Sequence, residues 1–290
     1  MNTMISTIRN NKGLSLLEVI VAMAIFGAPR SFPDGSEHTI TTATARKIEA
    51  GAASFPAAIL SRGPVGTNGN LVVDGRNHDR DGNLLGSGVL AISSRSTYAQ
   101  GGNSRVAGTT DAGINYDPTK SDPGLGAVTE QYATDWGDPS TPEQALGIST
   151  ANGLKIVAQS GMNGSQYAAD PSGLSFPLSG VTYVEIDGDD DWEAIDFGAS
   201  SGILVVHNAS TDAVIKNLNT GSFKGIIIAD DCIHIHTDII GCVINLTTNP
   251  SEGNVIGNGS GDVLFSSEAI ADAISMLDSF LDIVSWKEGF

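Results

Sequence analysis

Two short acidic segments carry oxygen ligands at spacings that suit a hard cation. The side chains stand at alternate positions: Asp187, Asp189 and Asp191 in one segment, and Asn77, Asp79 and Asp81 in the other. Carboxylate and amide oxygens are the ligands that Ca²⁺ prefers. Neither segment has the Glu that an EF-hand loop places at its twelfth position, where Gly198 and Gly88 stand instead. Two interpretations therefore stay open: calcium as a cofactor, or solvated acidic turns.

A second pattern combines thiol, imidazole and carboxylate groups. Cys232, His234, His236 and Asp238 alternate, so they would share one face of a strand. Thiolate and imidazole are metal ligands, but the same spacing also fits an exposed polar face of a sheet. Cys232 and Cys242 could form a disulfide if their Cα atoms lie within about 7 Å, or remain two buried thiols.

The P-loop, His-Glu-x-x-His and Cys-x-x-Cys motifs do not occur in the sequence. The adjacent acids Asp230 and Asp231 would point to opposite faces of a strand. That placement argues against the paired carboxylates of a glycosidase. We therefore predict no catalytic residue and no enzymatic activity. An enzyme with a β-helix fold that acts on polysaccharide is kept as an alternative function, ranked third after the two given below.

The N-terminal block is basic at its start and apolar after it. Residues 14–28 contain one charged side chain, Glu18, and Pro29 ends the run. A carboxylate inside an apolar segment is costly in lipid, so it needs a partner. In a polymer of such helices, Glu18 can pair with the free α-amino group of a neighbouring chain. As a helix the run is roughly 22 Å long, shorter than a ~30 Å hydrocarbon core.

The residues Lys-Gly-Leu-Ser-Leu-Leu-Glu-Val at 12–19 resemble the class III leader of type IV prepilins and type II secretion pseudopilins. The resemblance implies that a prepilin peptidase cuts after Gly13 and methylates Leu14, and that Glu18 aids assembly. The implied partners are that peptidase, other pilin-like subunits and, before assembly, the inner membrane. It implies a structural subunit, a minor pilin or pseudopilin of a type IV pilus or type II secretion-like assembly. The N-terminal helix would anchor it in the inner membrane, and its bulk would be periplasmic or exposed at the cell surface.

The C-terminal half resembles the extracytoplasmic domain of large PilX-like minor pilins. The segments that carry this resemblance are residues 202–208, 223–231 and 257–270. A second alternative for function is a surface-exposed adhesin or binding module, which calcium could stabilise.

Apolar runs that recur every 8–12 residues between turn clusters predict the fold of the rest of the chain. We expect a mainly β protein with an N-terminal helical stem, a β-rich extracytoplasmic domain and a C-terminal helix. The β-rich domain could be a short β-helix or solenoid, or a sandwich. The predicted regions are a leader (1–13), a stem helix (14–28), a linker with a short helix (29–65), a loop-rich β region (66–170), a β-rich domain (171–265) and a C-terminal helix (266–290).

Composition agrees with a turn-rich, exported β protein. The chain has 35 Gly in 290 residues, and 33 acidic against 15 basic side chains give a formal net charge of -18. Such a charge argues against binding to nucleic-acid phosphates, so no nucleic-acid partner is expected.

Overall fold

The structure, a computed structural model, describes residues 21–23, 30–31, 37–47, 55–120, 126–130, 137–187, 190–279 and 281–289. The chain divides into two compact units. The smaller unit comprises Met1–Ile48 and Ser279–Phe290, and the larger comprises Glu49–Asp278. None of the described helices is long and apolar enough to cross a membrane.

The smaller unit contains a 4-stranded antiparallel sheet built on one central strand, β3 (Glu37–Lys47). The strands paired with it are β1 (Val21–Met23), β2 (Arg30–Ser31) and β21 (Leu281–Gly289).

This sheet corrects two helix predictions. The linker 29–65 is predicted to contain a short helix, placed by its Ala-rich sequence from residue 43 onward, but residues 43–47 belong to β3. It also predicts a helix over 266–290, whereas Leu281–Gly289 forms β21. Threonines in β3, and Ile283, Val284 and Trp286 in β21, favour extended backbone, and pairing between the two strands outweighs helical periodicity. Of the predicted stem 14–28, only Val21–Met23 is described, as a strand; the remainder lies outside the described residues.

The larger unit contains a 15-stranded sheet in which all ladders between the described strands are parallel. Its strands are β4 (Ala57–Ser61), β5 (Val65–Gly69), β6 (Val72–Asp74), β9 (Leu90–Ser94), β10 (Tyr98–Gln100), β11 (Arg105–Ala107), β12 (Val128–Thr129), β13 (Gln166–Ala168), β14 (Val181–Val184), β15 (Asp191–Val206), β16 (Val214–Ala229), β17 (Asp231–Ile235), β18 (Asp238–Asn245), β19 (Val255–Gly259) and β20 (Asp262–Leu264). A hairpin of β7 (Asn77–His78) and β8 (Leu84–Gly86) stands apart from this sheet. The helices are α1 (Pro142–Ala145), α2 (Gly153–Ser160) and α3 (Ser267–Ser275), with 3₁₀ turns η1 (Met162–Gly164), η2 (Pro171–Gly173) and η3 (Met276–Ser279).

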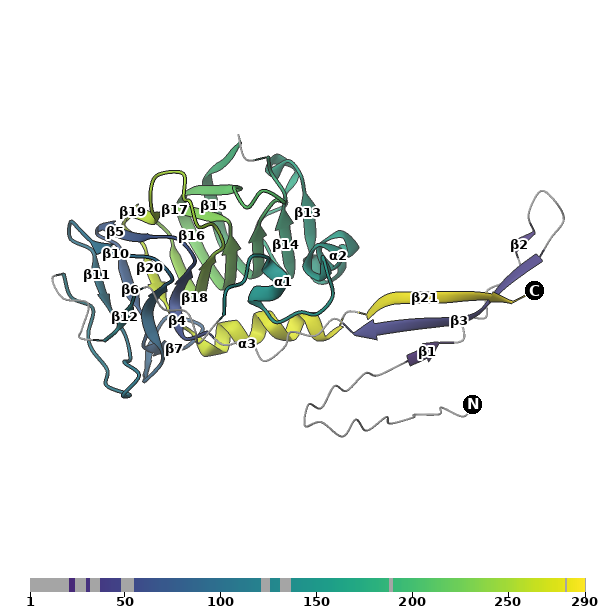
Figure 1. Ribbon diagram of the computed structural model, residues 1–290, viewed down its shortest axis with the longest axis horizontal. Helices are drawn as coiled ribbons and strands as arrows, with labels where there is room; N and C mark the ends of the chain where they lie inside the picture. Colours follow the sequence, from purple (N-terminus) through teal and green to yellow (C-terminus); the bar gives the residue numbers. More distant parts are fainter. Residues whose placement is uncertain are drawn as a thin grey trace. The chain divides into compact units, whose positions relative to one another are not determined.

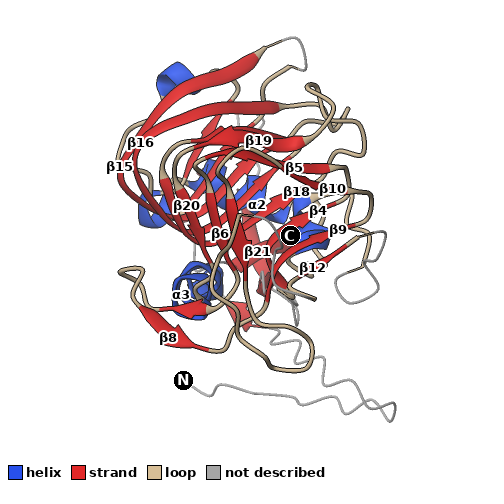
Figure 2. Ribbon diagram, turned by 90° about the vertical axis from the view of Figure 1, so that its left-hand side faces the viewer, coloured by secondary structure: helices blue, strands red, loops and turns tan. Residues whose placement is uncertain are grey.

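The parallel strands stack on three faces of a coil (Figures 1 and 2). Face A contains residues 191–195 and 214–218, followed by β17, β19, β5 and β10. Face B contains residues 222–224 and 238–240, followed by β20, β6 and β11. Face C contains β14 and residues 203–206, 226–229 and 242–245, followed by β4, β9 and β12. The fold is therefore the solenoid alternative rather than the sandwich.

The order of the coils differs from the order of the chain. After β18 the chain supplies face A with β19 and face B with β20, and face C of that coil is completed by β4, from the beginning of the unit. β5 then stacks on β19, and β6 on β20. The regions 66–170 and 171–265, which the sequence analysis separates, therefore form one continuous stack.

The core of the solenoid contains fully buried aliphatic ladders. One ladder crosses the junction between the two ends of the chain, and its members are Leu204, Ile227, Val243, Ile59 and Ile92. All five are 0% exposed. Burying each such side chain contributes about 1.5–3 kcal/mol, so these ladders hold the coils together.

Glycines form the corner between faces B and C. Gly202, Gly225 and Gly241 are in register, with φ of 107°, 134° and 145°. A Cβ on Gly225 would lie 2.1 Å from the carbonyl oxygen of Gly202 and 3.2 Å from Cβ of Ala273 in α3. The missing side chains let the backbone turn sharply and let α3 pack against β15, β16 and β18. Ser266 caps this helix, because its hydroxyl accepts from the backbone N–H of Ala269 at 3.2 Å.

Candidate functional site

The residues with a predicted processing or assembly role, Gly13, Leu14 and Glu18, lie outside the described residues. Apart from Asp189, which also lies outside the described residues, the other predicted site residues lie in the larger unit.

The acidic loop after β6 makes contacts that hold α3 and β16 rather than converging on one point. Asn77 Oδ1 accepts from the backbone N–H of Ser267 at 3.0 Å, at the start of α3. The Asp79 carboxylate accepts from two backbone N–H groups of its own loop, at 2.8 and 2.9 Å. Asp81 pairs with Lys224 Nζ at 2.9 Å. The three predicted calcium ligands therefore have separate protein partners.

Other residues of this loop also reach the segment that carries α3. Arg80 forms an ion pair with Asp272 and approaches Glu268 at 4.0 Å. His78 Nδ1 lies 3.2 Å from the carbonyl oxygen of Phe265. The loop is thus a docking element for the end of the solenoid chain.

The second acidic segment lies at the start of β15. Asp187 is exposed, and Asp189 lies outside the described residues. A hollow of about 670 Å³ is lined by four carboxylates, those of Asp170, Asp190, Asp191 and Glu193. Across the part of the chain that the structure describes, no three His, Cys, Asp or Glu side chains are grouped as a metal ion would require.

The two cysteines are free, and both are fully buried. Cys232 lies on face A, whereas Cys242 lies on face C, in register with Ile226. Burial raises the pKa of both thiols, so they remain protonated side chains of the core. His234 and His236 are partly exposed and Asp238 is exposed, so the alternating pattern divides between the core and the surface.

A histidine–carboxylate pair that the sequence analysis does not identify links consecutive coils. His207 Nδ1 lies 2.6 Å from Oδ1 of Asp230, which is 0% exposed. The other carboxylate oxygen accepts from the backbone N–H groups of Asn208 and Ala213. Asp231, its neighbour in sequence, instead accepts from the backbone N–H and hydroxyl of Ser251. The two acids therefore have different partners, although Asp230 lies in the bend between β16 and β17 and not on a strand with Asp231.

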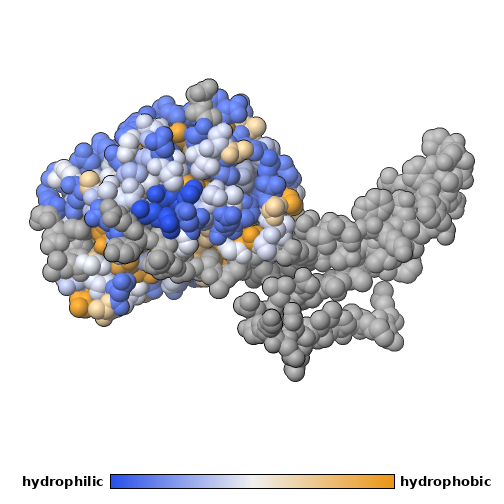
Figure 3. Space-filling model, in the orientation of Figure 1, coloured by the Kyte–Doolittle hydropathy of each residue, from blue (hydrophilic) through white to orange (hydrophobic). Residues whose placement is uncertain are grey.

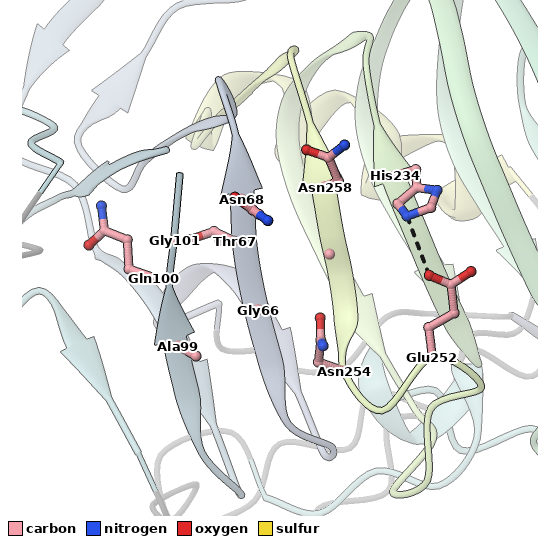
Figure 4. A pocket seen from close by; sticks show the side chains of 11 residues that line it. Gly66, Thr67, Asn68, Ala99, Gln100, Gly101, His234, Glu252, Asn254 and Asn258 are labelled. Carbon is pink, nitrogen blue, oxygen red and sulfur yellow. Dashed lines mark ion pairs between the residues drawn. The ribbon is translucent and has the colours of Figure 1, made fainter. Parts of the chain in front are cut away.

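A groove of about 300 Å³ crosses face A over β17, β19, β5 and β10 (Figure 4). Its lining is dominated by amides and glycines. The lining residues are Gly66, Thr67, Asn68, Ala99, Gln100, Gly101, His234, Glu252, Asn254, Gly257 and Asn258.

Glycines on neighbouring strands make room for three of the amide side chains near the groove. The Oδ1 atom of each Asn would lie 2.3–2.4 Å from a Cβ built on the glycine beneath it: Asn254 over Gly66, Asn258 over Gly69, and Asn68 over Gly102. Any side chain at those glycines would displace an amide. The amide-lined surface therefore depends on these glycines.

The charged groups of the groove lie at one end, beside β17. Glu252 pairs with Lys216 Nζ at 2.8 Å and with His234 Nε2 at 3.4 Å (dashed in Figure 4). The hydrogen bond from Lys216 lowers the pKa of Glu252, so this carboxylate is ionised and its charge is balanced. His234 Nδ1 also lies 3.1 Å from Asn217 Oδ1, which fixes the ring.

The floor of the groove is supported from within. Thr67 Oγ1 lies 2.9 Å from the Tyr98 hydroxyl and 3.2 Å from the Ser104 hydroxyl. Burial raises the pKa of Tyr98 to about 12, so the phenol stays protonated in this hydrogen bond. Strands β5 and β10 therefore present a rigid surface to a ligand.

The groove residues carry a local signal that resembles turns. Gly-Asn-Gly at 257–259 and Thr-Asn-Gly at 67–69 contain the Asn-Gly pair that is typical of tight turns. In the structure the two segments are strands in exact register, with Asn258 beside Asn68. The site becomes apparent only when β19 pairs with β5, 190 positions away in sequence, and a single sequence does not show that pairing.

Residues 8–28 match the family model of the prokaryotic N-terminal methylation motif. No curated protein and no solved structure matches the chain. The matched segment includes Gly13, Leu14 and Glu18, and it points to a type IV pilin-like or pseudopilin protein with a prepilin-type leader.

Proposed function

We propose that this protein is a minor pilin or pseudopilin, a structural subunit of a type IV pilus or type II secretion-like assembly. The observation that carries the proposal is the methylation motif at residues 8–28. In this proposal the peptidase hydrolyses the peptide bond between Gly13 and Leu14 and then methylates the new α-amino group. Residues 14–28 hold the chain in the inner membrane before assembly, and the solenoid faces the periplasm or the exterior.

Glu18 supplies the assembly step in this proposal. It is the only charged side chain among residues 14–28. A buried carboxylate is stable only when it is paired, and the α-amino group of a neighbouring subunit is the nearest cation that a helical array offers. The charge pair would set the register between adjacent subunits.

We also propose that the role is structural rather than catalytic. Asp230 and Asp231 are 0% and 2% exposed, and their carboxylates contact different partners. Paired carboxylates in glycosidases instead face the scissile bond from two sides. The burial of both acids supports the structural role.

Mass spectrometry of the mature N-terminus tests the proposal. The full chain is co-expressed with a prepilin peptidase, and the N-terminal peptide is sequenced. We expect a chain that begins with N-methylated Leu14, and an uncut chain in the variant Gly13→Val. An intact leader, or a cut after Ala28, in the wild-type chain would refute the proposal.

A second candidate function is recognition of a surface ligand, and the groove on face A favours it. A rigid, hollowed face with unoccupied amide donors and acceptors is a feature of a binding module. The two functions are compatible, because an assembled subunit can also present a binding face.

A further inference from the structure

We propose that the groove on face A binds a neutral oligosaccharide. This deepens the second candidate function, recognition of a surface ligand, and it does not depend on the leader or on assembly.

The first argument is the hydrogen-bonding character of the lining. Among the described residues, the side chains of Asn254 and Asn258 have no hydrogen-bond partner, and Asn68 uses only its Oδ1, toward the N–H of Gly69. An amide both donates and accepts, as a hydroxyl group does. A ligand rich in hydroxyl groups is therefore the chemical complement of this lining.

The second argument is charge. The lining contains one carboxylate, Glu252, and it is already paired with the ammonium group of Lys216. The chain as a whole has a formal net charge of -18. An anionic ligand would meet long-range repulsion and find no unpaired cation in the groove, so the ligand is neutral.

The third argument is the lack of an apolar anchor. Ala99 is the only apolar side chain apart from glycine in the lining. Protein and peptide partners are usually held by buried aromatic or aliphatic anchors, which need apolar pockets. The composition of the groove therefore favours a saccharide over a peptide.

The fourth argument is periodicity. Asn258 and Asn68 are in register on adjacent strands, and adjacent strands are ~4.8 Å apart. A linear polymer that crosses the strands would meet an amide on each of them. The volume of about 300 Å³ lies at the lower end of the ~300–1,000 Å³ range of ligand sites, which suits a short segment of such a chain.

Calorimetric titration of the full chain tests this proposal, in a detergent without a sugar headgroup. The probes are three neutral hexasaccharides (cellohexaose, maltohexaose and chitohexaose) and one polyanion, hexagalacturonate. We expect at least one neutral hexasaccharide to bind and hexagalacturonate not to bind. The failure of all three neutral probes at millimolar concentration, or binding of the polyanion alone, overturns the proposal.

Two variants locate the binding. Ala99→Trp fills the groove from an exposed position, and Asn254→Ala with Asn258→Ala removes two unpartnered amides. We expect the double amide variant to weaken binding about tenfold or more, because two hydrogen bonds to the ligand are lost. We expect Ala99→Trp to weaken binding by a similar factor, because the indole occupies the groove. The matched control, Asn219→Ala with Asn249→Ala, changes two exposed amides outside the groove and should bind like wild type.

If Ala99→Trp does not fold, the double amide variant alone tests whether the groove binds the oligosaccharide. Wild-type affinity in a folded double variant would overturn the proposal. Processing of the leader is read separately by mass spectrometry, so failure of the groove and failure of the pilin assignment are distinguishable.

Discussion

The carboxylate of Asp231 is held in a poor environment for a charge. One oxygen accepts two hydrogen bonds from Ser251, and the other is buried without a partner among the described residues. Burial raises the pKa of Asp231 above its usual value, and the nearby acids Glu252 and Asp191 raise it further. The neighbouring Asp230 differs, because both of its oxygens are hydrogen-bonded.

The raised pKa of Asp231 gives a pH-dependent contribution to stability. The folded state binds this proton more tightly than the unfolded chain does. The contribution is therefore complete below the unfolded pKa, and it is lost as pH rises through the folded pKa. We expect Asp231→Asn, which keeps an acceptor for Ser251, to be more stable than wild type at about pH 7.5. The advantage should shrink toward about pH 3, where wild type is also neutral.

Urea unfolding followed by circular dichroism across this pH range measures the difference. The control is Asp111→Asn, at an exposed position, for which the difference should be small at every pH. An advantage of Asp231→Asn that grows toward acid pH would contradict burial as the cause.

At the scale of elements, the glycine corner determines how closely α3 approaches the solenoid. Gly225 is bounded by the carbonyl of Gly202 on one side and by Ala273 on the other. It has φ of 134°, which an L side chain rarely adopts. Strain and overpacking therefore act together at this position.

We expect Gly225→Ala to lower the free energy of unfolding by roughly 2–5 kcal/mol. The control is Gly173→Ala, where an added Cβ meets nothing within 4 Å; it should change stability by less than about 0.5 kcal/mol. Urea unfolding of the two variants measures both values. Equal stability of the two variants would show that the corner tolerates a side chain.

Several strands of the solenoid could be predicted because they are short apolar runs between turn residues. The runs Val181–Ile186, Ile203–Val206 and Ile239–Leu246 coincide with β14, the end of β15 and β18. The corner at Gly202 and Gly225 could not be predicted, because β15 and β16 continue as strands on both sides of it. β21 was missed because its apolar spacing also fits a helix, and only pairing with β3 decides between them.

The methylation motif could be found in the sequence because all of its residues lie in one continuous segment, residues 8–28. The groove and the His207–Asp230 pair could not, since their members come together only when the coils stack. The predicted calcium ligands have the right composition, but Asn77 and Asp81 are used for docking α3 and β16. Composition alone does not separate a ligand from a docking residue.

At the scale of the whole molecule, polar and apolar side chains of the larger unit are separated between its surface and its core. The face of the larger unit in Figure 3 is mostly hydrophilic, with small scattered apolar patches. The aliphatic side chains are concentrated in the ladders of the core. Such a surface favours solubility outside the membrane, which agrees with the proposed exposure of the solenoid.

The coil completed by β4 joins segments that are far apart in sequence. β4 lies between β18 and β9, so it is the only described strand of face C that links the C-terminal coils to the N-terminal ones. Leu60 is 1% exposed and stands in register with Ile244 and Ser93. Loss of packing at Leu60 should therefore weaken both sides of the junction at once.

We expect Leu60→Ala to lower the free energy of unfolding by roughly 2–5 kcal/mol, as other truncations of buried leucines do. Because the stack is continuous through β4, amide exchange should accelerate in both β18 and β9. Hydrogen exchange with mass spectrometry reads the two strands separately. Leu85→Ala is the matched control, since Leu85 is 56% exposed in β8 and its truncation should leave both strands protected. If Leu60→Ala accelerated exchange in only one of the two strands, β4 would not couple the coils on its two sides.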